Sequence, residues 1–134
     1  MVPIGLESER PHHKKALRNL TDQLRPVFNE SIEGVFIYLD GEHKSCNDRL
    51  ADMFGYTPLQ WEALYPFEKL FSAESRENVM ATYYERIIAE KAPAELDFTG
   101  IRKDGSSFSA RIVMAPISCE GLIFALCFVK RIAD

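Results

Sequence analysis

Residues 95–116 read ELDFTGIRKDGSSFSARIVMAP. Apolar and polar residues alternate along 95–102 and again along 107–116, and a period of two is typical of a strand with one buried face. The intervening Lys103-Asp104-Gly105-Ser106 has the composition of a tight turn, with Gly105 expected at positive φ. The stretch therefore predicts an antiparallel hairpin. Its predicted inward-facing residues are Leu96, Phe98, Gly100, Phe108, Ala110, Ile112 and Met114.

A third strand is predicted at 122–131, after a turn at 118–121. Its side chains are apolar on both faces, and such a strand has to be covered on both faces. We expect helices within 48–90 to cover one face. The other face needs a different cover, and the N-terminal segment is the available candidate.

Upstream of these strands, the sequence predicts a hairpin and several short helices. The apolar run 34–39 is followed by Asp40-Gly41, a type I′ turn signal, and by a returning strand at 42–46. Asn47 is a good N-cap for a helix at 48–54, which Gly55 ends. Pro58 suits the first turn of a further short helix. Ser72 is placed to cap a longer helix over 73–90.

The order of these elements contains no alternation of strand, helix and parallel strand. It predicts an α+β fold, a five-stranded antiparallel sheet with short helices on one face and an amphipathic helix at the N-terminus. We expect two parts, a tail and amphipathic helix at 1–23 and a compact domain at 24–131. Within the first part, residues 1–11 contain Pro3, Gly5 and Pro11 and are expected to be a loose tail.

The N-terminal helix carries an apolar stripe with three- and four-residue spacing, and Pro26 should kink or end it. This stripe and the outer face of 122–131 are two apolar surfaces that need partners. We therefore predict a homodimer, the alternative being that the helix folds back on its own sheet. The residues predicted at the dimer interface are Leu17, Leu20, Leu24 and Phe28.

Three stretches in order resemble a PAS domain, the family of sensory boxes. They are Asn47 with Ala51 and Phe54-Gly55-Tyr56-Thr57-Pro58, then Ile101-Arg102-Lys103-Asp104-Gly105-Ser106, then Phe128-Val129-Lys130-Arg131. The resemblance spans about 24–131 and implies the strand order 2-1-5-4-3. It also implies a sensory and signal-transduction module that binds a small molecule, forms a dimer, or both, and relays a signal to an effector such as a histidine kinase.

A ligand pocket is expected between the sheet and helices 48–90, because large apolar side chains converge there. The residues predicted to line it are Phe54, Trp61, Phe71, Tyr83 and Met114. Asn47 is expected to cap the helix at 48–54 and tie the hairpin to it, the alternative being a ligand contact at the pocket mouth. Tyr56 is expected either to donate a hydrogen bond into the pocket or to be a packing residue with a solvated hydroxyl.

No cofactor is predicted, although haem or flavin is not excluded and a haem- or flavin-binding sensor is the alternative hypothesis. Residues 73–90, where the resemblance would place a haem-binding histidine, contain none. The cysteine of flavin photoreceptors is also missing from its usual motif. Cys46, Cys119 and Cys127 lack metal-site spacing, so no metal site is predicted.

Composition narrows the classes of function further. Apolar residues make up 46% of the 134 residues, and the net charge is −4. This charge disfavours binding to nucleic acid or to an anionic membrane, and no signal-like N-terminus is present, so we expect a cytoplasmic protein. No catalytic set is apparent, so we predict that the chain is not an enzyme. The alternative from another class is a small cone-shaped α+β isomerase or hydrolase, which would need an acid–base pair in its cavity.

Overall fold

The computed structural model describes residues 2–89 and 93–134. Its five-stranded sheet has the order β2-β1-β5-β4-β3, and all neighbouring strands are antiparallel. The predicted fold class and strand order are therefore confirmed. The strands are β1 (Gly34–Asp40), β2 (His43–Cys46), β3 (Ala94–Ile101), β4 (Ser107–Cys119) and β5 (Leu122–Ala133).

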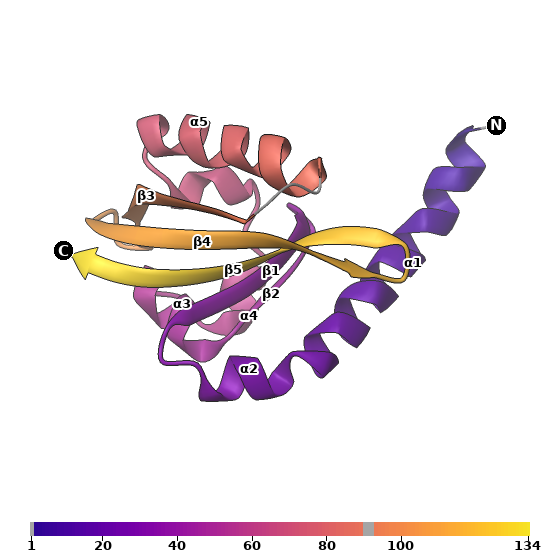
Figure 1. Ribbon diagram of the computed structural model, residues 1–134, viewed down its shortest axis with the longest axis horizontal. Coiled ribbons are helices and arrows are strands. Elements are labelled where there is room, and N and C mark those ends of the chain that lie inside the picture. Colours follow the sequence, from indigo (N-terminus) through magenta and orange to yellow (C-terminus); the bar gives the residue numbers. More distant parts are fainter. Residues whose placement is uncertain (1, 90–92) are drawn as a thin grey trace.

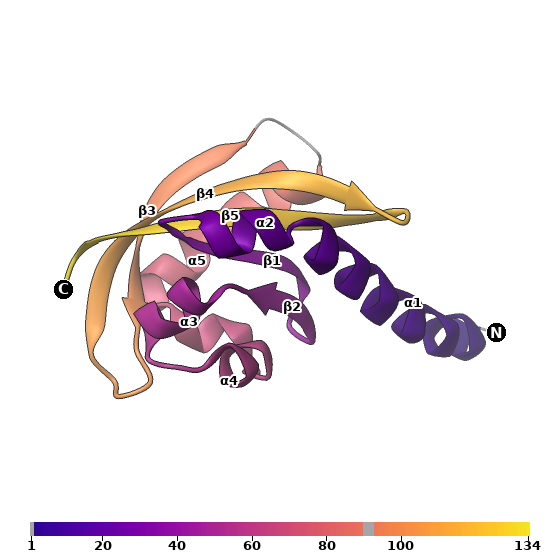
Figure 2. The same cartoon turned by 90° about the horizontal axis from the view of Figure 1, so that it is seen from below.

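The sheet curves around a group of short helices on its inner face (Figure 2). Asn47 and Thr57 cap α3 (Asp48–Phe54) and α4 (Pro58–Glu62) through their side-chain oxygens, and Ser72 caps α5 (Ala73–Thr82) in the same way. The long helix predicted at 73–90 changes to a π-helical segment, and residue 90 lies outside the described residues. The inner-face segments are α3 (Asp48–Phe54), α4 (Pro58–Glu62), η1 (Phe67–Leu70), α5 (Ala73–Thr82) and η2 (Tyr83–Ile88).

Two helices precede the sheet, α1 (Val2–Gln23) and α2 (Arg25–Glu30). The expectation of a loose tail over 1–11 is wrong from Val2 onward, because the helix already starts there. Pro3 falls in its first turn, where a missing N–H costs nothing. The predicted break near Pro26 is confirmed, since α1 ends at Gln23 and Pro26 lies in the first turn of α2. The N-terminal part of α1 projects beyond the sheet (Figure 1).

The core has two parts, one on each face of the sheet. The inner cluster joins β1, β3, β4 and β5 to α3, α4 and α5, and includes Phe36, Trp61 and Met114. The outer cluster joins α1 and α2 to β1 and β5, and includes Leu20 and Phe124. The strand 122–131 is thus covered on both faces, by helices within 48–90 on one side and by α1 and α2 on the other, as its apolar pattern predicts.

One turn differs from its prediction. Asp40 pairs with His43, and the loop residue Gly41 is not among the residues with positive φ that a type I′ turn requires. Instead, Asp40 Oδ1 accepts the backbone N–H of Glu42 and of His43, each over 2.9 Å. A side chain therefore holds this turn, and a β-bulge lies beside it. The positive φ predicted at Gly105 is confirmed, at 91°.

Candidate functional site

The space between the sheet and the inner helices is the first candidate site. All five residues predicted to line a pocket there are buried in the inner cluster. Phe54 packs edge-to-face on Phe108, with ring centroids 5.0 Å apart. Trp61 contacts Phe36 at 5.2 Å, and Phe71 contacts Phe98 at 5.2 Å. These rings pack against one another rather than around an opening.

The space that remains there has a volume of about 20 Å³. Phe71, Tyr83 and Met114 line it, whereas Phe54 and Trp61 do not. A volume of this size holds about one water molecule, while ligand pockets are typically about 300–1,000 Å³. The ligand-sized cavity predicted here is therefore not formed, because the aromatic side chains fill it. A ligand-binding role for the five residues stays a prediction.

Two tyrosines give this space its polar groups. The Tyr83 hydroxyl donates a hydrogen bond to the backbone oxygen of Leu39 over 3.1 Å. Its ring lies edge-on to Tyr38, with centroids 5.3 Å apart. Burial raises the pKa of Tyr83 to about 12 and also raises the pKa of Tyr38. Both hydroxyls are thus kept neutral, and neither is a base at ordinary pH.

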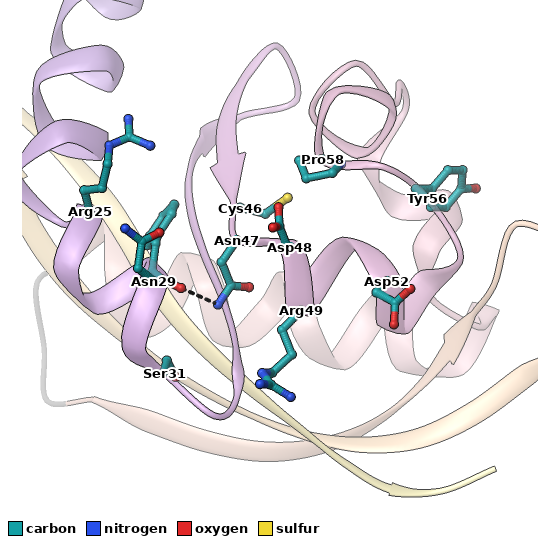
Figure 3. Close-up of a pocket in the computed structure, with 11 residues that line it drawn as sticks. Arg25, Asn29, Ser31, Cys46, Asn47, Asp48, Arg49, Asp52, Tyr56 and Pro58 are labelled. Atoms are coloured by element: carbon teal, nitrogen blue, oxygen red, sulfur yellow. Dashed lines mark hydrogen bonds between the residues drawn. The ribbon is translucent and has the colours of Figure 1, made fainter.

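The second candidate site is an open groove of about 620 Å³ between α2 and the segment from β2 to α4 (Figure 3). Arg25 and Asn29 on α2 face Asn47 and Asp48 on the opposite side. Its charged and amide residues are Arg25, Asn29, Asn47, Asp48, Arg49 and Asp52. Asn47, considered for the mouth of the pocket, and Tyr56, considered for a hydrogen bond into it, both line this groove rather than the interior space.

Asn47 connects the two sides of the groove. Its Oδ1 accepts the backbone N–H of Leu50 at 2.9 Å and of Val35 at 3.0 Å, so it caps α3 and holds β1. Its Nδ2 donates to the backbone oxygens of Phe28 at 3.1 Å and Glu33 at 3.2 Å. The predicted capping role is confirmed. The bond to α2 was not foreseen, because no sequence pattern relates Asn47 to Phe28.

Comparison with known proteins rests on structure. No protein-family model matches the sequence, and no curated protein sequence matches it significantly. A PAS domain of an HTR-like protein from Haloarcula marismortui superimposes with a TM-score of 0.65 at 20% identity, covering 91% of this chain and 99% of that one. A PAS domain from a two-component sensor histidine kinase gives 0.65 at 15% identity, covering 86% and 98%. The chain has the PAS fold.

A further PAS neighbour carries a ligand. It is the PAS domain, in complex with ethanol, of a LuxR-family transcriptional regulator from Burkholderia thailandensis. Its TM-score is 0.65 at 19% identity, with 81% of this chain and 96% of that chain covered.

In this PAS fold, the predicted dimer stripe lies against its own sheet. Leu20 and Phe28 are buried in the outer cluster, while Leu17 and Leu24 are half-buried at its edge. The single chain thus adopts the alternative in which the helix folds back in cis.

Sequence reasoning also missed a buried lysine in this PAS fold. Lys44 is 2% exposed, and its Nζ donates to the backbone oxygens of Gly41, Glu62 and Leu64 at 2.5, 3.1 and 2.8 Å. Burial lowers the pKa of Lys44 and raises that of the nearby Glu62 carboxyl, which accepts the Cys46 N–H. Lys44 fastens the β1–β2 hairpin to the end of α4.

None of the helices in the described part of the chain is long and apolar enough to span a membrane.

Proposed function

We propose that this chain is a sensory and signal-transduction module that works as a homodimer and relays a signal through α1 and α2 to an effector. The observation that carries the proposal is the link made by Asn47. One side chain caps α3 on the inner face of the sheet and also bonds to α2 on the outer face. A shift of α3 therefore acts directly on the position of α2.

The homodimer is proposed to form over the outer face and α2. Packing of α1 leaves apolar side chains exposed there, with Val27 at 37%, Val113 at 36% and Ile132 at 51%. Val113 and Ile132 project from the outer side of β4 and β5, and Val27 lies on α2. A self-complementary surface of this kind most often closes by two-fold symmetry. Movement of α2 would then displace the residues of the partner chain that contact it.

Binding of a small molecule is a second candidate function, and we place it in the groove. The side chains of Asn29 and Arg49 line the groove and form no hydrogen bond or ion pair with the residues that the structure describes. Pockets combine such convergent polar groups with volumes like this one. The residues that line the small interior space are apolar apart from Tyr38, Tyr83 and Cys127, and they include no acid–base pair. This disfavours the isomerase or hydrolase hypothesis. The effector and a cytoplasmic location stay predictions.

Hydrogen–deuterium exchange tests the relay. Asn47→Asp keeps the oxygen that caps α3 but loses both donated bonds, including the one to Phe28. Amides of α1 and α2 should therefore exchange about tenfold faster in this variant, while the β3–β4 hairpin exchanges as in the wild type. Unchanged exchange in α1 and α2 would show that Asn47 does not couple the helices, and the relay would have to be abandoned.

A further inference from the structure

Three potential metal ligands meet where α1 crosses the β1–β2 hairpin. His13 comes from α1, and Asp40 and His43 flank the turn of the hairpin. One ligand atom from each of the three lies within 4.8 Å of the others, and all three residues are half-buried. The rings of His13 and His43 meet edge-to-face, with centroids 5.5 Å apart.

We propose that His13, Asp40 and His43 bind one divalent transition-metal ion of the Zn²⁺ class, and that this ion fastens α1 to the β1–β2 hairpin. Two imidazoles and a carboxylate are a donor set that suits zinc, with water completing the coordination. The proposal stands on this cluster alone and does not depend on the proposed function.

The hairpin side of the site is already ordered. Asp40 Oδ1 accepts the Nδ1–H of His43 over 2.8 Å, as well as the two backbone N–H groups of the turn. An ion bound by both residues would replace this ring hydrogen bond, with the His43 ring proton on Nε2 and the Nδ1 lone pair turned to the ion beside Asp40. Asp40 Oδ2 has no hydrogen bond within the described chain and is left for the ion.

The distances require only a small contraction. Tetrahedral zinc with bonds of about 2.0–2.1 Å holds its ligand atoms roughly 3.3 Å apart. The atoms here are at most 4.8 Å apart, and half-exposed side chains can rotate to close that gap. The positive charge of Lys44, whose Nζ is bound to Gly41 in the same turn, opposes a cation and should moderate the affinity.

The position of the site gives the ion a structural effect. Within the described residues, the side chains of α1 form three other hydrogen bonds to the sheet. His12 and Asn19 bond to Glu120 in the β4–β5 turn, and the hydroxyl of Thr21 bonds to that of Ser45. His13 is thus the contact of α1 with the β1–β2 turn. A bound ion would attach α1 to this turn more strongly. Without the ion, the ring contact between His13 and His43 joins the two segments.

Zinc titration by isothermal calorimetry, on protein without an affinity tag, tests the site. The wild-type chain should bind one Zn²⁺. The variants His13→Gln and His43→Gln should each weaken binding at least tenfold. The matched control is His12→Gln, since His12 is the neighbouring histidine but bonds to the Glu120 backbone oxygen instead. It should bind as the wild type does.

A second measurement on the wild type needs no variant. Ring resonances of His13 and His43 should shift or broaden on adding Zn²⁺, while those of His12 stay in place. Failure of the wild type to bind Zn²⁺ at tens of micromolar overturns the proposal. Equal affinity in His13→Gln, or an equal loss in His12→Gln, overturns it too, since the ion would then lie elsewhere.

Discussion

The side-chain amide of Asn47 donates a hydrogen bond to the backbone oxygen of Phe28 over 3.1 Å. This bond joins the start of α3 to α2 across the groove, and Asn47 is buried while making it. The side chain of Asn47 thus forms hydrogen bonds to one helix on each face of the sheet, α2 and α3.

Asn47→Ala should lower the free energy of unfolding by about 2–4 kcal/mol, because it removes a helix cap and leaves buried backbone groups without partners. Urea denaturation measures this loss. The matched control is Ser72→Ala, which removes the cap of α5 but no bond to α2. It should cost only about 1 kcal/mol. An equal cost for the two variants would mean that the bonds of Asn47 to Phe28, Glu33 and Val35 contribute nothing.

The Glu62 carboxyl should give stability a specific pH dependence. Burial raises its pKa in the folded chain above the ordinary value of 4.5. Between those two values the folded chain binds more protons than the unfolded chain. The free energy of unfolding therefore falls as pH rises through this window.

Glu62→Gln should remove that fall and be more stable than the wild type at pH 7, because the amide oxygen can still accept the Cys46 N–H. Chemical denaturation at a series of pH values measures it. Glu42→Gln, an equal change of charge at an exposed position of the same hairpin, is the control and should keep the wild-type dependence. If Glu62→Gln showed the same pH dependence of the free energy of unfolding as the wild type, the fall with pH would have to come from another group.

Gly105→Val should cost about 1–3 kcal/mol through backbone strain alone. Gly105 has a φ of 91°, and a Cβ built there meets nothing within 4 Å, so no steric clash contributes. Gly105→Asn is the graded control, since asparagine tolerates positive φ better, and its cost should be clearly smaller. Equal stability of the valine variant and the wild type in urea would contradict a strained turn.

Local rules predicted most of the fold. Alternation assigned the inward residues of β3 and β4 correctly, because one face of each strand is buried and the other is open. Asn47 and Gly55 were identified as the two ends of α3, since capping depends on neighbours within four residues. The resemblance supplied the strand order, which local patterns do not determine.

The rest depended on contacts between distant segments. The sequence predicted a type I′ turn at Asp40-Gly41. The pair of positive φ values that this turn type requires occurs instead at Glu120-Gly121. The Asp40 carboxylate stabilises the first turn in another way. Likewise, large inward side chains predicted a pocket, whereas their sizes add up to a filled core. Whether large inward side chains leave a cavity depends on how they pack against one another in three dimensions, and the spacing of apolar residues along the sequence does not determine this.

The homodimer is tested most directly by sedimentation velocity at tens of micromolar, with two single variants. Val113→Asp places a charge on the exposed outer face of β4, and Leu59→Asp places one on α4, where Leu59 is 79% exposed. We predict that the wild type and Leu59→Asp sediment as dimers and that Val113→Asp sediments as a monomer. A monomeric wild-type chain, or a Val113→Asp variant that remains dimeric, would contradict association through the outer face.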